Sequence, residues 1–286
     1  MWPIRTMCDV LNVSTSGYYD SLVFEPSVRA VRHDQIRHVV QQVYDEHDGI
    51  YGSWKIADVL RERDHLESAC RNTVASAMRE LGLKSRVCKA FKPTTTQADP
   101  SKRPADNVLQ QDFEADRPNE KWVTDITYIA TAAGWVYLAA VMDCFSRKIV
   151  GWSLHDSLAT ALVSAALHNA IEQRRPNIIG EGLLHHSDRG CQYTSDAYQH
   201  TLKTLGITCS MSRTGCCYDN ATMERFFWSV KHEWTNHHTY ADLAAARSSI
   251  FQYIEMFYNR KRIHQALGYM TPEQYETVHA PESDVA

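Results

Sequence analysis

Several patterns that would assign a protein class directly are absent from this chain of 286 residues. No apolar run approaches the roughly 18–20 residues that a membrane-spanning helix needs, and residues 1–5 lack the apolar core of a signal peptide. The eight cysteines include no CxxC pair and no His/Cys spacing typical of zinc, and only Cys216 and Cys217 are adjacent. We therefore expect reduced cysteines in a cytoplasmic protein with no membrane partner.

An excess of basic charge is also lacking, since the formal net charge is −4. The charges are unevenly distributed, however. Between Arg71 and Arg103 the sequence holds eight lysine and arginine residues against Glu80 and Asp99. This local excess is suited to a phosphate backbone, although a solvated helix face and linker would have the same charge.

The first part of the chain has the apolar spacing of short helices. The pattern predicts one helix over 31–44, a second that begins near Ser53, and a third capped by Asn72 and ended by Gly82. Three short helices with a basic last segment predict a helix-turn-helix-like DNA-binding module. A plain helical bundle is the alternative.

The domain organisation follows from composition. The helical module takes residues 1–90, and residues 91–108, which are rich in proline and threonine, read as a linker. In residues 109–286 the β-forming and apolar patterns predict strands at 121–130, 135–144, 148–154, 182–186 and 207–209, with helices at 158–173 and 195–205. A further long helix, capped by Asp219 and Asn220, carries Glu224. We expect a mixed five-stranded α/β sheet flanked by helices, with a C-terminal helical extension.

Three acidic residues lie where such a fold presents side chains. Asp125 lies within the first predicted strand, Asp188 follows the fourth, and Glu224 comes after 35 intervening residues, near the start of a helix. Each alone is most simply a surface or salt-bridging group. Together they would repel one another unless divalent cations lay between them. Hard carboxylate oxygens around two metal ions are the usual means of attacking a phosphodiester in line.

The chain resembles the catalytic proteins of bacterial insertion sequences of the OrfB type, from the family numbered three. It is similar more broadly to retroviral-type integrase cores, which have the ribonuclease-H-like fold. The motifs that carry the resemblance span nearly the whole chain and are residues 51–52, 78–83, 122–128, 143–147, 150–152, 186–190, 218–221, 226–227, 258–259, 266–268 and 271–272, together with Glu224, Lys231, Arg262 and His264.

The resemblance implies a DDE-type transposase that cleaves DNA and transfers strands at insertion-sequence ends. It assigns Asp125, Asp188 and Glu224 as ligands of two Mg²⁺ or Mn²⁺ ions. Lys231, which shares a helix face with Asn220, Glu224 and Trp228, resembles the family's basic residue near the scissile DNA, although a solvated lysine is equally consistent with the pattern. The other candidate DNA contacts are Arg189, Arg225 and Asn220. We expect Asp143 and Arg147 to form a structural pair across a strand turn.

The resemblance also implies partners. These are the terminal inverted repeats of the element, target DNA, and further copies of the chain in a homo-oligomer assembled on DNA. In the family, a separate upstream reading frame supplies a helix-turn-helix and a coiled coil, and no sustained heptad is present here. An upstream-frame partner or fusion is therefore expected to assist end recognition.

The sequence departs from the family pattern at Trp54-Lys55, at Cys216-Cys217 and at Arg225. None of these positions is one of the three acids. Two other functions stay open. A ribonuclease H or exonuclease on the same fold is disfavoured because no second acid follows Asp125 closely. A non-enzymatic DNA-binding repressor or inactive relative is disfavoured by the intact acidic triad.

Overall fold

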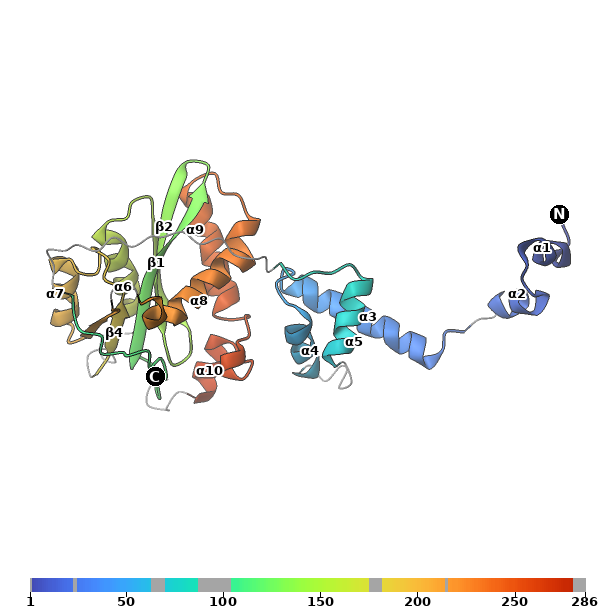
Figure 1. Cartoon of the computed structure of the whole chain (residues 1–286), viewed down its shortest axis with the longest axis horizontal. Coiled ribbons are helices and arrows are strands. Elements are labelled where there is room, and N and C mark those ends of the chain that lie inside the picture. The colour runs from blue at the N-terminus through green and yellow to red at the C-terminus, as the bar shows by residue number, and fades with distance from the viewer. Residues whose placement is uncertain are drawn as a thin grey trace. The chain divides into compact units, whose positions relative to one another are not determined.

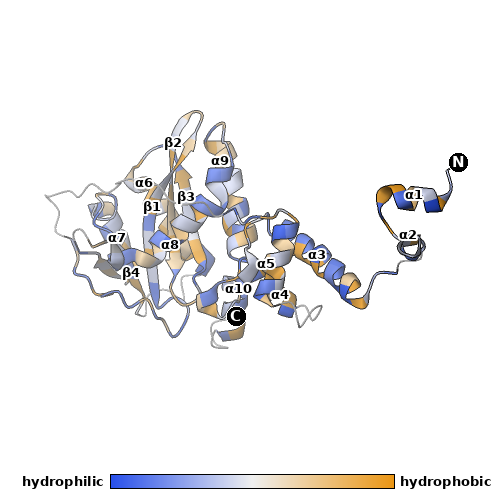
Figure 2. Ribbon diagram, turned by 45° about the vertical axis from the view of Figure 1, so that its right-hand side comes forward, coloured by the Kyte–Doolittle hydropathy of each residue, from blue (hydrophilic) through white to orange (hydrophobic). Residues whose placement is uncertain are grey.

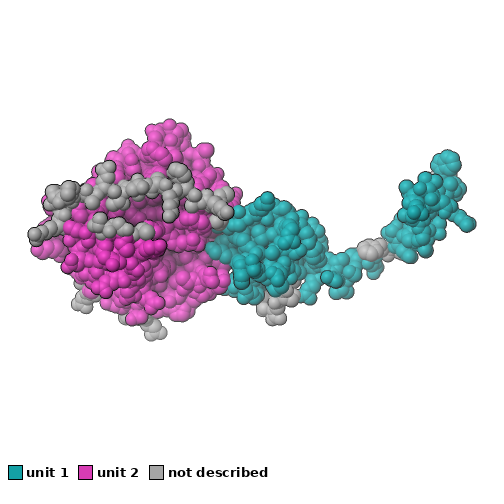
Figure 3. Space-filling view, in the orientation of Figure 1, with its two compact units in different colours: residues 1–85 teal, residues 86–286 magenta. Residues whose placement is uncertain are grey.

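The computed structural model describes residues 2–22, 25–62, 70–86, 104–174, 182–213 and 216–279. The chain divides into two compact units, residues 1–85 and residues 86–286, which are coloured separately in Figure 3. Most of the segment predicted to be a linker, residues 91–103, lies outside the described residues. None of the described helices is long and apolar enough to cross a membrane.

The first unit is helical. Its elements are α1 (Ile4–Leu11), α2 (Thr15–Leu22), α3 (Val28–Glu46), α4 (Ser53–Glu62) and α5 (Arg71–Glu80). Helices α3, α4 and α5 pack together around buried apolar side chains such as Val40, Leu60 and Val74. Helix α5 begins at Arg71, with Cys70 at the N-cap, so the prediction that Asn72 caps this helix is wrong. Gly82 ends it with a φ of 69°, as its freedom from a Cβ allows.

The second unit is built on a five-stranded sheet, as predicted (Figure 1). Its strands are β1 (Lys121–Thr131), β2 (Gly134–Asp143), β3 (Ile149–His155), β4 (Leu184–Ser187) and β5 (Thr208–Met211), in the order β3-β2-β1-β4-β5. The first three strands form an antiparallel meander, whereas β4 and β5 run parallel to β1. The central strand β1 therefore joins the antiparallel and parallel halves.

Helices cover both faces of this sheet. Figure 1 shows α6 (Thr160–Arg174) and α7 (Asp196–Thr204) on one side, and α8 (Ala221–Ser229) and α9 (Leu243–Phe251) on the other. The apolar core between the sheet and the first pair includes Trp122, Val141, Leu167 and Leu202. In Figure 2 the hydrophobic colour covers much of β2. The alternation of buried and exposed positions is weak in β2, because its last six residues are all buried.

Backbone segments approach closely where β3 meets α6. A Cβ added to Gly151 would lie 2.3 Å from the carbonyl oxygen of Ala166 and 2.5 Å from the backbone nitrogen of Ala170. Such separations are far below van der Waals contact, and both atoms belong to the backbone of α6. Only glycine therefore fits at residue 151 without moving α6.

The C-terminal part of the unit consists of short helical segments. A 3-10 turn (Cys217–Asn220) precedes α8, and α8 continues into a π-helical segment (Val230–Trp234) and a 3-10 turn (Thr235–His237). Helix α9 likewise continues into a π-helical segment (Gln252–Tyr258), which is followed by a 3-10 turn (Gln265–Leu267) and α10 (Pro272–His279).

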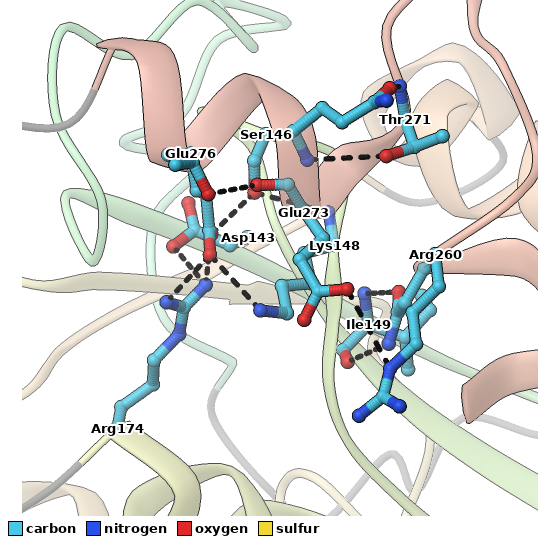
Figure 4. Close-up of polar contacts among 12 residues, drawn as sticks. Asp143, Ser146, Lys148, Ile149, Arg174, Arg260, Thr271, Glu273 and Glu276 are labelled. Atoms are coloured by element: carbon cyan, nitrogen blue, oxygen red, sulfur yellow. Dashed lines mark hydrogen bonds and ion pairs between the residues drawn. The ribbon is translucent and has the colours of Figure 1, made fainter. Parts of the chain in front are cut away.

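Helix α10 is attached to the end of β2 by a buried ionic network (Figure 4). Asp143 is fully buried and lies 3.2 Å from Arg174 of α6, which also pairs with Glu276 of α10. Lys148 Nζ lies 3.2 Å from the Glu276 carboxylate. Burial raises the pKa of Asp143 to about 6, although Arg174 opposes this shift.

The predicted pair between Asp143 and Arg147 is wrong. Arg147 instead donates to the Thr222 hydroxyl at 2.8 Å, near the start of α8. Arg147 has a φ of 61°, so the turn after β2 carries its side chain away from Asp143. The partner of Asp143 comes from α6, far away in the sequence.

Candidate active site

The topology brings the three predicted acids to one region of the sheet. Asp125 lies in the middle of β1, and Asp188 directly follows β4, which pairs in parallel with β1 through Val123 and His186. Glu224 lies in the first turn of α8, which packs on β1. Asp125 and Asp188 are half-buried, and Glu224 is exposed.

Asp188 and Glu224 are close enough to Asp125 to raise the pKa of its carboxyl. The pKa of Asp125 is raised well above its ordinary value, first by burial and then by the negative charges of Asp188 and Glu224. Two backbone groups orient the aspartates: Ile126 N donates to Asp125 Oδ1 at 2.8 Å, and Gly190 N donates to Asp188 Oδ1 at 2.9 Å. The site therefore accumulates negative charge in a partly desolvated place, which favours a bound cation.

These residues suit a divalent metal by their chemistry. They offer hard carboxylate oxygens, which Mg²⁺ and Mn²⁺ prefer. Among the described residues, no three His, Cys, Asp or Glu side chains converge as closely as in a preassembled metal site. The triad is thus near enough for electrostatic coupling without forming a closed cage, and a cation between the carboxylates would relieve their repulsion.

A buried aromatic residue lies beneath the aspartates. Thr124 Oγ1 donates to the carbonyl of Ala140 at 2.8 Å, and the Tyr193 hydroxyl lies 3.2 Å from the same Thr124 oxygen. Because the threonine proton is committed to Ala140, Tyr193 must donate to Thr124. The pKa of Tyr193 is raised well above its ordinary value. Burial is the largest cause, and the charges of Asp125 and Asp188 are among the others. No sequence pattern pointed to Tyr193 beyond its nearness to Asp188.

The start of α8 is fixed to β1 by Asn220. Its side-chain Nδ2 donates to the carbonyl of Thr124 at 3.0 Å, and only 6% of the residue is exposed. Asn220 occupies the N-cap position of α8, as predicted, but its side chain makes no capping hydrogen bond. Only a small part of Asn220 is exposed, and its expected contact with DNA stays a prediction. The hydrogen bond from Asn220 to Thr124 holds the start of α8, and with it Glu224, at a set distance from the strand that carries Asp125.

A second anchor holds the turn before α8. Asp219 is fully buried and accepts hydrogen bonds from Arg213, Gln111 and Asn107. The Arg213 guanidinium is the largest cause of the strongly lowered pKa of Asp219. The segment that follows residue 103 is held nearby, since the backbone nitrogens of Val108 and Leu109 both donate to Ser210 Oγ of β5. The sequence did not indicate this cluster, which joins segments about a hundred residues apart.

Lys231 lies against an aromatic ring close to the triad. Its Nζ lies 4.1 Å from the centroid of Tyr128, three residues after Asp125 on β1. Burial lowers the pKa of Lys231, and the charge of Asp125 opposes this shift. The face of an aromatic ring attracts a cation, more strongly where water is partly excluded, so Tyr128 helps to hold the Lys231 ammonium group in place. Tyr128 is thus a neighbour of the site that the sequence reading missed.

The other basic candidates have different environments. Arg189 Nε donates to the carbonyl of Ser212 at 2.6 Å, which fixes its side chain beside Asp188. Arg225 is exposed, and its guanidinium carbon lies 4.6 Å from the centroid of the Trp228 ring.

A buried ion pair supports the helix that carries Glu224. Arg262 and Glu233 form two hydrogen bonds of 2.6 and 2.7 Å, and Tyr253 donates to the same carboxylate at 2.9 Å. Burial by itself would lower the pKa of Arg262. The Glu233 carboxylate outweighs this effect, so the pKa of Arg262 is raised. This pair connects the π-helical segment after α8 to the C-terminal segment.

Three family models match the chain. One described as an integrase core domain matches residues 115–217, and a second with the same description matches residues 205–272. A model described as an HTH-like domain matches residues 32–91. The two integrase matches together include Asp125, Asp188 and Glu224.

Relatives match over almost their whole length. The transposase InsF for insertion sequence IS3A of Escherichia coli (strain K12) is 37% identical over 278 residues, which cover 96% of this chain and 93% of that protein. The insertion element IS600 uncharacterized 31 kDa protein of Shigella sonnei is 36% identical over 269 residues, which cover 94% and 97%.

Solved structures with a similar arrangement include a simian T-cell lymphotropic virus intasome, with a TM-score of 0.47 and 16% identity over 79% of this chain and 75% of that chain. The HTLV-2 integrase catalytic core domain in complex with magnesium has a TM-score of 0.43 and 17% identity over 57% of this chain and 99% of that chain. The identity to InsF, together with the integrase-core matches around the acidic residues, is decisive: the chain belongs to the IS3-family transposases, enzymes of the DDE type with an integrase catalytic core.

Proposed function

We propose that Asp125, Asp188 and Glu224 are the catalytic carboxylates with which this transposase cleaves and joins DNA at the ends of its insertion sequence. The observation that carries the proposal is electrostatic. Two acids from separate elements, Asp188 and Glu224, raise the pKa of Asp125, so three far-separated acids of the sequence share one site. A cluster of this kind is unfavourable in the folded protein unless cations neutralise it.

The carboxylates would hold two divalent ions, Mg²⁺ or Mn²⁺. When bound, such ions polarise the attacking oxygen, from water or a 3′-hydroxyl, and neutralise charge on the leaving 3′ oxygen. The chain's own contribution is positioning. Backbone donors at Ile126 and Gly190 orient the aspartates, while Asn220 fixes the start of α8 to β1 and thereby places Glu224.

Basic side chains around the triad would bind the DNA backbone. Lys231 is the best placed, because Tyr128 and the charge of Asp125 hold its ammonium group near the carboxylates. Arg189, Arg225 and Asn220 are the other proposed contacts with DNA, whether to its backbone or to its bases. Residues 1–90 would act as the DNA-binding module, residues 91–108 as the linker and residues 109–286 as the catalytic domain.

The terminal inverted repeats of the element and a target duplex would be the DNA partners. Because two ends must be joined, we propose that the chain works as a homo-oligomer on paired ends, assisted by an upstream-frame partner or fusion. DNA of the bacterial cell is the substrate, so the place of action would be the cytoplasm.

The test is metal-dependent nicking of a labelled duplex that carries the terminal repeat. Asp188→Asn should remove cleavage in Mg²⁺ and in Mn²⁺ while the far-UV spectrum and the unfolding midpoint stay near those of the wild type. Glu172→Gln changes an exposed carboxylate on α6 and is the matched control, which should cleave normally. Cleavage by the folded Asp188→Asn variant at the wild-type rate would refute the assignment.

A further inference from the structure

Three planar side chains form a stack that begins at the residue after Glu224. The Arg225 guanidinium lies over the Trp228 ring, with 4.6 Å between its carbon and the ring centroid. The Trp228 ring stacks on His232, with centroids 4.4 Å apart and an interplanar angle of 16°. Since both partners lie this close to one indole, they must occupy its opposite faces. The order of the stack is therefore Arg225, Trp228, His232.

The inner end of the stack is rigid and its outer end is exposed. His232 is 5% exposed, and its Nδ1 lies 2.8 Å from the carbonyl oxygen of Trp228, which fixes the imidazole orientation. Arg225 is exposed to solvent. Within the described parts of the chain, no carboxylate pairs with the Arg225 guanidinium. The stack thus ends in an exposed guanidinium that lies over a ring packed on the buried His232.

This geometry distinguishes two uses of an arginine. A phosphate contact requires only the charge and the N–H edge of the guanidinium, and it gains nothing from an indole and an imidazole packed in a row behind it. A nucleobase, in contrast, stacks face to face on an aromatic ring or a guanidinium plane. Bases inside a duplex stack on their neighbours, so only an unpaired base can occupy such a platform.

We propose that the Arg225–Trp228–His232 stack is a binding subsite for one unpaired nucleobase next to the scissile phosphate. Its place follows from Trp228, which lies one turn after Glu224 on the same face of α8. The subsite holds the end of the DNA open beside the carboxylates and deepens the proposed function, on which it rests.

The experiment tests whether the loss of one DNA base and the loss of the Arg225–Trp228–His232 stack have the same effect on binding. Duplexes carrying the element's terminal repeat are made with one abasic nucleotide at each position around the cleavage site, and binding is measured without divalent ions by fluorescence anisotropy. The proteins are wild type, Arg225→Lys, Arg225→Gln and Trp228→Leu. Arg260→Lys, an exposed arginine paired with Glu273, is the matched control.

The proposal predicts one position at which loss of the base weakens wild-type binding about tenfold. The same abasic change should weaken Arg225→Lys and Trp228→Leu by less than about twofold, because their platform is already lost. Arg260→Lys should behave like the wild type. Arg225→Lys removes no buried group, so it carries the test even if Trp228→Leu folds poorly.

Three results would overturn the proposal. Equal abasic penalties in all proteins would show that the stack does not contact a base. Wild-type binding by Arg225→Lys with weak binding by Arg225→Gln would reduce Arg225 to a phosphate contact. A wild-type protein whose binding is weakened by no abasic position would refute the subsite and would leave the proposed function untouched. Cleavage by Asp188→Asn, measured separately in Mg²⁺, would refute only the catalytic assignment and would leave a measured base coupling intact.

Discussion

The buried pair of Glu233 and Arg262 allows a stability prediction of definite size. The two side chains are 4% and 9% exposed and share two short hydrogen bonds. In Arg262→Met, the Glu233 carboxylate stays buried without its cationic partner, and the neutral Tyr253 hydroxyl still donates to it. Removing one member of a buried pair costs about 3–5 kcal/mol, which shifts the unfolding equilibrium by two to three and a half orders of magnitude.

Urea and thermal unfolding of the full chain would measure this loss. For a unit of this size, about 3–5 kcal/mol corresponds to a fall of roughly 10 °C in the unfolding midpoint. The double variant Glu233→Gln with Arg262→Met should be more stable than Arg262→Met alone, because no buried charge is left without its partner. A single variant that loses less than about 1 kcal/mol would contradict the buried, charge-paired state of Glu233.

Three other predictions concern the catalytic unit. Gly151→Ala should destabilise the unit by more than about 3 kcal/mol, because its Cβ meets the backbone of α6. Adding Ala170→Gly should not restore the stability measured by urea unfolding. Restored stability in the double variant would refute the clash with backbone atoms. Burial, aided by His186, lowers the pKa of His185 from its ordinary 6.5 to about 3, so the unfolded state binds the extra proton and stability falls as pH drops below 6.5. The loss from this group is about 2 kcal/mol between pH 7.5 and 5, and His185→Gln should flatten that part of the stability profile; an unchanged profile would contradict the neutral buried imidazole. Tyr128→Leu should raise the KM for DNA more than it lowers kcat, because the Tyr128 ring holds Lys231. Tyr128→Phe keeps the ring and should behave like the wild type. Equal loss of activity in both variants would exclude a role for the aromatic face.

The sequence predicted the order of elements because each signal is local. The strand pattern of 121–130 and the helix signal that starts near Ser195 agree with β1 and α7, and Ser195 does cap α7 by accepting from Tyr198 N. The acids could be proposed because each lies within a predicted strand, directly after one, or near the start of a helix, and because the resemblance to integrase cores assigned them a common role.

Contacts between distant segments were not predictable in the same way. Asp143 was assigned to the nearby Arg147, yet its partner is Arg174, delivered by the packing of α6. Asn220 has the residue type and place of a helix cap, but β1 offers its side chain the carbonyl of Thr124 instead. Such choices depend on which tertiary partner lies within reach, and a pattern along the chain does not contain that distance.

Strand transfer in vitro is the most direct test of the central claim. A labelled duplex with the element's terminal repeat is incubated with target DNA and Mg²⁺ or Mn²⁺, using wild type and Glu224→Gln in parallel. The account predicts joined products from the wild type that require the metal ion and disappear in the folded Glu224→Gln variant. Joined products from Glu224→Gln at the wild-type level would contradict the assignment of Asp125, Asp188 and Glu224 as the catalytic carboxylates.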